Sequence, residues 1–224
     1  MAMPSSEDIK SDLRQELSDL TRSLAASRDA VRHAFQNLAK GGSATSLEAD
    51  AGTNTNTVSK PLPIRREVGL TSLFDDLKSA GLDPETEVLE YKTQLAGPHM
   101  SAFFNGGDEE EIVHIKRLRY SRGFPLAILT NMLLASSAPT SASLTDSGLY
   151  KQLEAQGFKP VSGSQYVGAR RATLEEAELL QIAEGAAVIT VERTVYAEND
   201  ELISIEEGIY DASQYLLTFS LPTE

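Results

Sequence analysis

Residues 112–120 read IVHIKRLRY, and residues 188–196 read VITVERTVY. Both stretches have an apolar residue at the first and fourth positions, an arginine at the sixth and a tyrosine at the ninth. Each stretch is strand-like and is followed by a turn and another strand-like run. The repetition predicts two similar hairpins side by side in one antiparallel sheet, with helices packed on one face.

The rest of the second half of the chain mixes further strands with short helices, which is an α+β pattern. Strand-like runs are Glu87–Leu95, Glu111–Tyr120, Leu126–Leu134, Val161–Ala169, Ala187–Tyr196, Leu202–Tyr210 and Tyr215–Leu221. Hairpin turns are expected at residues 121–123 and 198–200. Ser72 can cap a helix Leu73–Ala80 that stops at Gly81, and Thr173 with Glu176 predicts a capping box for a helix Leu174–Ile182.

Composition narrows the class of protein. The 224 residues are 41% apolar and include no cysteine, so disulfides, thiol catalysis and thiolate metal sites are excluded. The three histidines, His33, His99 and His114, are not spaced as a metal or triad set, and we expect neither a metal nor a cofactor. No apolar run approaches the roughly 18 residues of a membrane span, and no signal-peptide pattern is present. We expect a cytoplasmic protein.

The charge is unevenly distributed along the chain. Seven Lys and Arg residues nearly balance eight Asp and Glu residues in residues 1–60, whereas 13 stand against 25 in residues 61–224. The net charge of −13 therefore belongs to the second part, and the nearly neutral first part remains compatible with nucleic-acid binding. Small polar residues and two prolines between residues 41 and 66 predict a loose hairpin and a linker.

The first part has the pattern of a helix-turn-helix. Val31, Ala34, Phe35 and Leu38 follow the spacing of one helix face, and Ser27 can cap that helix. The opposite face carries Arg28, Arg32 and His33. In such motifs the second helix lies in the major groove, where arginine binds guanine edges or phosphates. A solvated polar face on a packing helix is the alternative.

Residues 19–35, DLTRSLAASRDAVRHAF, resemble the helix-turn-helix of the GntR superfamily. The match is specific at Ser27-Arg28 and Val31-Arg32, and it implies that Arg28 and Arg32 bind operator DNA. Ser27 and His33, which flank them, are further candidates for DNA binding. Ala30 stands where the family usually has threonine. The expected wing, residues 46–53, carries two acids and no Lys or Arg. These departures leave open a DNA-binding half that has lost its activity.

Residues 62–222 resemble the UTRA ligand-sensing domain of the HutC subfamily. The resemblance is carried by Leu70-Thr71-Ser72, Val88-Leu89-Glu90, residues 115–120, Gly148-Leu149-Tyr150, residues 175–180, Val191-Glu192-Arg193, Ile209-Tyr210-Asp211 and Tyr215. It implies a fold similar to chorismate lyase, an antiparallel sheet with helices. We therefore expect a winged helix-turn-helix in residues 1–58, a linker in residues 59–69 and a UTRA-like domain in residues 70–224.

A candidate site emerges from strand periodicity. Side chains alternate along a strand, so Val113, Ile115, Arg117 and Arg119 share one face. Arginines on an apolar face are costly without anions, so an internal carboxylate or a bound anion must neutralise them. Backbone N–H groups at Thr71 and Ser72 favour an anion at the start of a helix.

The UTRA resemblance joins these two clusters into one effector site and adds Ser147, Tyr150 and Tyr210. Amino-sugar phosphate sensors carry acids where this chain has Leu129 and, nearby, Ser204. The resemblance therefore implies a small anionic effector rather than an amino sugar. We expect a homodimeric repressor of a palindromic operator, in which the effector reorders residues 70–81 and the linker. The alternatives are a lyase acting on a small anion, and a ligand-binding protein with a degenerate DNA-binding half.

Overall fold

The computed structural model describes residues 64–67, 69–96, 100, 103–104 and 110–218. The predicted helix-turn-helix, with Ser27, Arg28, Arg32 and His33, lies outside the described residues, as does most of the predicted linker. Among the described residues, no helix has both the length and the apolar character needed to cross a membrane.

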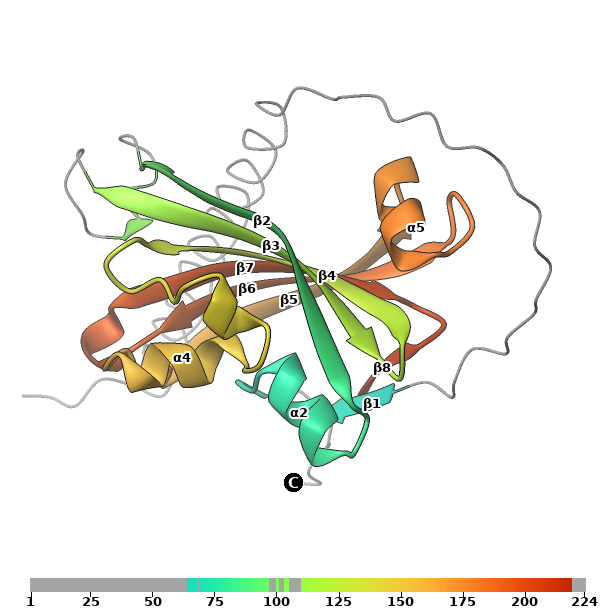
Figure 1. The fold of residues 1–224 in the computed structure, drawn as a ribbon, viewed down its shortest axis with the longest axis horizontal. Helices are drawn as coiled ribbons and strands as arrows, with labels where there is room; N and C mark the ends of the chain where they lie inside the picture. The colour runs from blue at the N-terminus through green and yellow to red at the C-terminus, as the bar shows by residue number, and fades with distance from the viewer. Residues whose placement is uncertain (1–63, 68, 97–99, 101–102, 105–109, 219–224) are drawn as a thin grey trace, which may run out of the picture. The chain divides into compact units, whose positions relative to one another are not determined.

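Six antiparallel strands form the main sheet (Figure 1). In spatial order they are β2 (Pro84–Leu95), β3 (Glu111–Ser121), β4 (Phe124–Leu134), β7 (Leu202–Asp211), β6 (Ala187–Tyr196) and β5 (Ser162–Arg171). The two hairpins that the repeated pattern predicts, β3–β4 and β6–β7, lie side by side and are joined through the β4–β7 pairing. This part of the prediction is confirmed.

Tight turns close both hairpins where the sequence predicts them. Arg122 and Gly123 connect β3 to β4 with φ values of 53° and 75°. Two successive left-handed residues match the right-handed twist of the flanking strands, and glycine adopts this conformation without a steric penalty. A short 3-10 segment, η2 (Glu198–Asp200), connects β6 to β7.

Helices cover both faces of the sheet, so the prediction that they pack on one face is wrong. The helix α4 (Leu149–Ala155) packs on Val113 and Ile115, and the 3-10 segment η1 (Ala142–Leu144) joins the same cluster. The helix α5 (Leu174–Leu180) packs on Leu118 and Ile128 on the opposite face (Figure 1). The reason is that β3 buries apolar side chains on both faces.

The helix α2 (Leu73–Ser79) lies on the same face as α4. Its Leu73 and Leu77 pack against side chains of β4, β6 and β7. Ser72 occupies the N-cap position, as predicted, but its side chain forms no capping hydrogen bond. The capping box of Thr173 and Glu176 at the start of α5 is confirmed, with both reciprocal bonds present.

A separate two-stranded sheet joins the two ends of the described chain. The strand β1 (Ile64–Glu67) pairs in parallel with β8 (Tyr215–Thr218), with Ile64 opposite Tyr215. Residues 64–67 were expected to belong to the linker. They form a strand that precedes α2 by a short segment, and their hydrogen-bonding partners come from the far end of the sequence.

Candidate functional site

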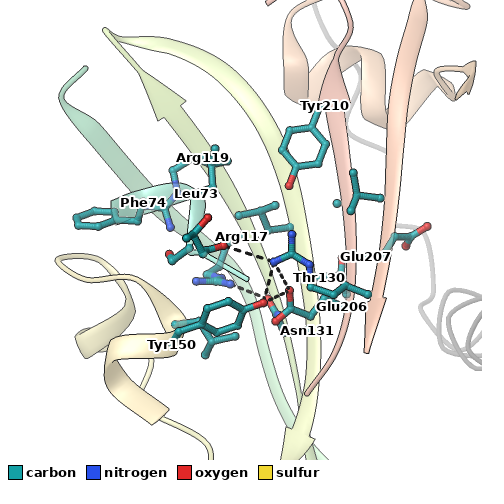
Figure 2. Close-up of a pocket in the computed structure, with 17 residues that line it drawn as sticks. Leu73, Phe74, Arg117, Arg119, Thr130, Asn131, Tyr150, Glu206, Glu207 and Tyr210 are labelled. Atoms are coloured by element: carbon teal, nitrogen blue, oxygen red, sulfur yellow. Dashed lines mark hydrogen bonds and ion pairs between the residues drawn. The ribbon is translucent and has the colours of Figure 1, made fainter. Parts of the chain in front are cut away.

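A small cavity lies between α2, α4 and the sheet (Figure 2). Of the residues proposed from sequence to bind the effector, it brings together Thr71, Ser72, Arg117, Arg119, Tyr150 and Tyr210. Ser147 is not among the lining residues. The volume of the cavity is about 50 Å³. Since a single water needs roughly 10–15 Å³ of such space, the cavity suits a group of a few heavy atoms.

The arginines of β3 are the most deeply buried charges at this site, at 3% exposure for Arg117 and 1% for Arg119. Arg117 donates through Nη2 to Asn131 Oδ1 at 2.6 Å, and Arg119 donates to Thr86. The ring of Phe74 lies 4.8 Å from the Arg119 guanidinium. The Nε group of each arginine is buried without a hydrogen-bond acceptor. Both side chains therefore retain donors that a bound anion can satisfy.

No carboxylate forms an ion pair with either arginine among the residues that the structure describes. Burial lowers the pKa of Arg117 to about 10, although the charge of Glu206 partly opposes this. Burial lowers the pKa of Arg119 to about 9, and the neighbouring charge of Arg117 lowers it further. Two adjacent cations in a desolvated site repel each other, and a nearby negative charge would stabilise both.

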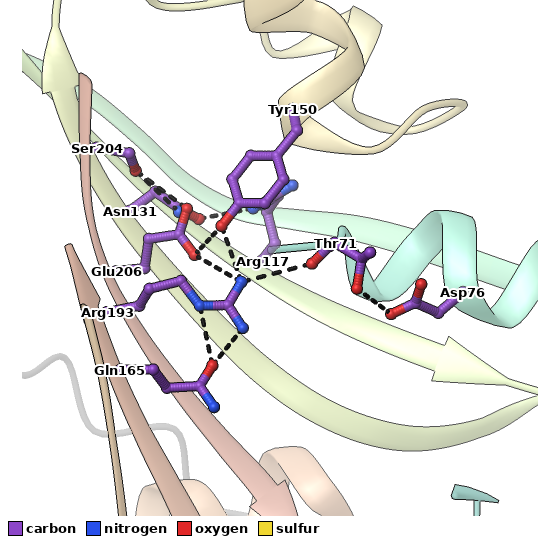
Figure 3. Close-up of polar contacts among 9 residues, drawn as sticks. All are labelled: Thr71, Asp76, Arg117, Asn131, Tyr150, Gln165, Arg193, Ser204 and Glu206. Carbon is purple, nitrogen blue, oxygen red and sulfur yellow. Dashed lines mark hydrogen bonds and ion pairs between the residues drawn. The ribbon is translucent and has the colours of Figure 1, made fainter. Parts of the chain in front are cut away.

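A third buried arginine, Arg193 on β6, lines the same cavity, and Figure 3 shows its polar contacts. Its Nε donates to Gln165 Oε1 at 3.0 Å, and its Nη1 donates to the Tyr150 hydroxyl at 2.8 Å. The same Nη1 lies 3.8 Å from Glu206 Oε2. Sequence reasoning did not include Arg193 in the site. The signal was present, because the repeated pattern aligns Arg193 with Arg117.

An acidic residue, Glu206, also lines the cavity, two positions after Ser204, near which amino-sugar phosphate sensors carry an acid. Its Oε2 accepts a hydrogen bond from Tyr150 at 3.0 Å, and its Oε1 accepts one from Ser204 at 3.2 Å. Leu129 lines the wall as an apolar residue. Alternation along β7 places Glu206 and Tyr210 on one face, a signal that could have identified Glu206 from sequence.

Two tyrosines take different places in the site. Tyr150 donates its hydroxyl proton to Glu206 and accepts from Arg193, and burial raises the pKa of this phenol. Tyr210 lines the cavity and stacks on Tyr215, with ring centroids 4.1 Å apart. Tyr150 therefore takes part in polar contacts at the site, while Tyr210 connects the cavity wall to the core.

The segment before α2 closes one side of the cavity. Thr71 donates through its hydroxyl to Asp76 Oδ2 at 2.9 Å, which fixes Thr71 to the helix that follows. The start of α4 approaches closely at Gly148, where a β-carbon would lie 2.3 Å from Ser72 Oγ and 2.5 Å from Asp75 Oδ2. A residue without a side chain is thus required where α2 and α4 meet.

Comparison with known proteins agrees with this fold and site. Residues 79–215 match the UTRA domain family. The HTH-type transcriptional repressor NagR of Bacillus subtilis is 30% identical over 191 residues, covering 84% of this chain and 77% of that protein.

Solved structures extend the comparison. The effector domain of PhnF from Mycobacterium smegmatis has a TM-score of 0.65 at 17% identity, covering 71% of this chain and 100% of that one. A GntR-family transcriptional regulator from Enterococcus faecalis has a TM-score of 0.53 at 25% identity, covering 62% of this chain and 99% of that one.

The Bacillus subtilis and Enterococcus faecalis proteins are regulators of transcription, so the lyase alternative is set aside. The order of motifs that suggested a sensor domain from sequence is matched by a family assignment over most of the described residues. The chain therefore belongs to the UTRA family of ligand-sensing domains, within the GntR superfamily of transcription regulators.

Proposed function

We propose that this transcription regulator is a homodimeric repressor whose operator binding is modulated by a small anionic metabolite held by Arg117 and Arg119. The observation that carries the proposal is the burial of both guanidinium groups without an ion-paired carboxylate among the described residues. Charged groups this deep in a protein are normally paired, because desolvation of an isolated charge is expensive. A phosphate or carboxylate group of the metabolite supplies the missing charge.

The remaining groups in the cavity complete such a site. Arginine binds carboxylate and phosphate oxygens with a rigid fork of donors, and the unused Nε groups supply part of that fork. Asn131 orients Arg117, and Phe74 packs on Arg119. The helix α2 has only seven residues, so its dipole contributes less than the arginines do. The small volume favours one anionic group of the metabolite rather than a long acyl chain.

Repression by a dimer is supported by the name of the Bacillus subtilis relative, a repressor, and by a general argument about symmetry. One recognition helix reads few base pairs, whereas a two-fold dimer reads both halves of a palindrome. The effector would act by shifting α2 and β1, which lies at the start of the described chain. Such a regulator acts where the chromosome is, in the cytoplasm.

The first test is binding of the full chain to the DNA upstream of its own gene, at low and moderate salt. We expect specific retardation that weakens steeply with salt, because phosphate contacts release counterions. The variant Arg28→Ala/Arg32→Ala should lose it. The control variant Arg122→Ala/Arg171→Ala removes two exposed arginines of the UTRA domain and should retain it. If the wild-type is a folded dimer and still retards no upstream DNA, the proposal of a repressor is contradicted. That result would favour a sensor with a degenerate DNA-binding half.

A further inference from the structure

Arg193 lies where strands of the sheet meet α4 and the segment before α2 (Figure 3). It is 8% exposed and extends from β6 toward Gln165 on β5, Glu206 on β7 and Tyr150 on α4. Its Nη1 also donates to the backbone carbonyl of Thr71 at 3.4 Å, directly before α2. One guanidinium thus connects the sheet with both helices that cover the cavity.

The same guanidinium is linked to the anion site by a chain of polar contacts. Arg117 donates to Asn131, and Asn131 Nδ2 lies 3.5 Å from Ser204 Oγ. Ser204 donates to Glu206, which faces Arg193. We call Arg117, Asn131, Ser204, Glu206 and Arg193 the polar chain. It joins the arginine of β3 to the segment that precedes α2.

The contacts of Arg193 differ in strength. Those to Gln165 and Tyr150 have ordinary hydrogen-bond lengths, whereas those to the Thr71 carbonyl and to Glu206 are long, at 3.4 and 3.8 Å. Negative charge in the cavity attracts Arg193 and repels Glu206, and in a desolvated site both forces are strong. The two long contacts are therefore the ones that an anion changes first.

We propose that Arg193 is the positioning residue that couples anion binding to α2, an inference that rests on the proposed anion site. Without the anion, Arg193 holds the Thr71 carbonyl and thereby the start of α2 against the sheet. When an anion binds Arg117 and Arg119, Arg193 turns toward it and releases Thr71. Because the Thr71 hydroxyl is bonded to Asp76, the release reaches the first turn of α2. The strand β1 lies just before this segment and shifts next.

The test compares amide hydrogen exchange of the full-length wild-type and the Arg193→Gln variant, with and without inorganic phosphate at millimolar concentration. In the wild-type, phosphate should accelerate exchange at residues 73–77 roughly three- to tenfold, the effect of losing about one hydrogen bond. In Arg193→Gln, these amides should exchange faster from the start and show no further response, although calorimetry still detects phosphate binding.

Two further variants separate coupling from general loosening. Arg170→Gln makes the same chemical change on β5, where the arginine is bonded to Glu176 of α5, and should keep the wild-type response. Tyr150→Phe removes one hydroxyl that contacts Arg193 and should weaken the response even if Arg193→Gln folds poorly. A phosphate response that persists in Arg193→Gln overturns the proposal, as does unchanged exchange in a wild-type that binds phosphate. If the wild-type binds no phosphate, the anion site itself fails and the coupling with it.

Discussion

At the scale of single residues, Gly148 at the start of α4 lies close against the start of α2. Its α-carbon faces Ser72 and Asp75, so close that a β-carbon would lie 2.8 Å from the Ser72 β-carbon as well. Ser72 itself lines the cavity. The absence of a side chain at residue 148 therefore sets the separation of α2 and α4, and with it the width of the cavity.

The Gly148→Ala variant should be less stable than the wild-type by about 1–3 kcal/mol, the usual cost of overpacking. It should also bind phosphate more weakly, because Ser72 must move. Gly69→Ala is the matched control, since nothing lies within 4 Å of the position of its β-carbon. Urea unfolding of both variants measures the difference. Equal stability of the two would show that α2 and α4 are not held apart at this point.

A second prediction at this scale concerns the charge of Arg119. The pKa of Arg119, about 9, lies below the ordinary value for arginine. Because it still lies above neutral pH, the guanidinium is charged at neutral pH and attracts an anion. As pH rises through about 9, the guanidinium loses its proton and phosphate affinity should fall by up to roughly tenfold per pH unit. Calorimetric titrations at pH values below 9 and above 10 measure this fall. Affinity that stays constant across this range, in a protein that remains folded, would contradict a role for the Arg119 charge.

At the scale of elements, the face of the sheet under α5 has its own electrostatics. Glu207 of β7 is paired in register with Glu192 of β6. Burial raises the pKa of Glu207, and although Arg170 partly opposes this, Glu192 and Glu176 add to it. In its ionised form Glu207 therefore opposes the packing of this face.

The Glu207→Gln variant should be more stable than the wild-type at neutral pH, because it removes a buried charge. The sign follows from linkage: a carboxyl whose pKa is raised by folding is destabilising when ionised, and the penalty disappears as pH falls through that raised pKa. Thermal unfolding between neutral and acidic pH measures the difference, which should shrink on acidification. The exposed Glu198→Gln is the control. A gain in stability that is independent of pH would point to packing rather than charge.

Some of the elements could be predicted from the sequence and others could not. The strands and both hairpin turns follow from local patterns, because alternation and turn residues are local properties. The placement of α5 opposite α2 and α4 depends on which apolar face each helix covers, which periodicity does not specify. The strand β1 pairs with residues about 150 positions away, and no local signal marks it. Alternation along one strand identified Arg117 and Arg119, and alternation along β7 links Glu206 to Tyr210 in the same way. The position of Glu206 opposite Asn131, however, depends on the register between strands.

At the scale of the whole molecule, the acidic charge belongs to the part of the chain that carries the UTRA domain. Within that acidic domain, three buried arginines and two glutamates line the cavity. An acidic surface disfavours nonspecific contact with DNA, whereas the basic cavity favours a small anion. This distribution of charge supports the proposal that the domain senses an anion and that the first 60 residues bind DNA. The family assignment fits this division of roles.

The central claim is that Arg117 and Arg119 form an anion site, and calorimetric titration of the full chain with inorganic phosphate tests it most directly. Neither Arg117 nor Arg119 is ion-paired with a carboxylate among the described residues. The Arg117→Gln/Arg119→Gln variant therefore leaves no buried carboxylate unpaired and should remain folded. The wild-type and the control variant Arg170→Gln/Arg171→Gln should bind phosphate with similar affinity. The Arg117→Gln/Arg119→Gln variant should bind at least roughly 100-fold more weakly, since hydrogen bonds to charged groups contribute about 1.5–3 kcal/mol each. Phosphate binding of equal strength in all three proteins, or in none of them, would contradict the account.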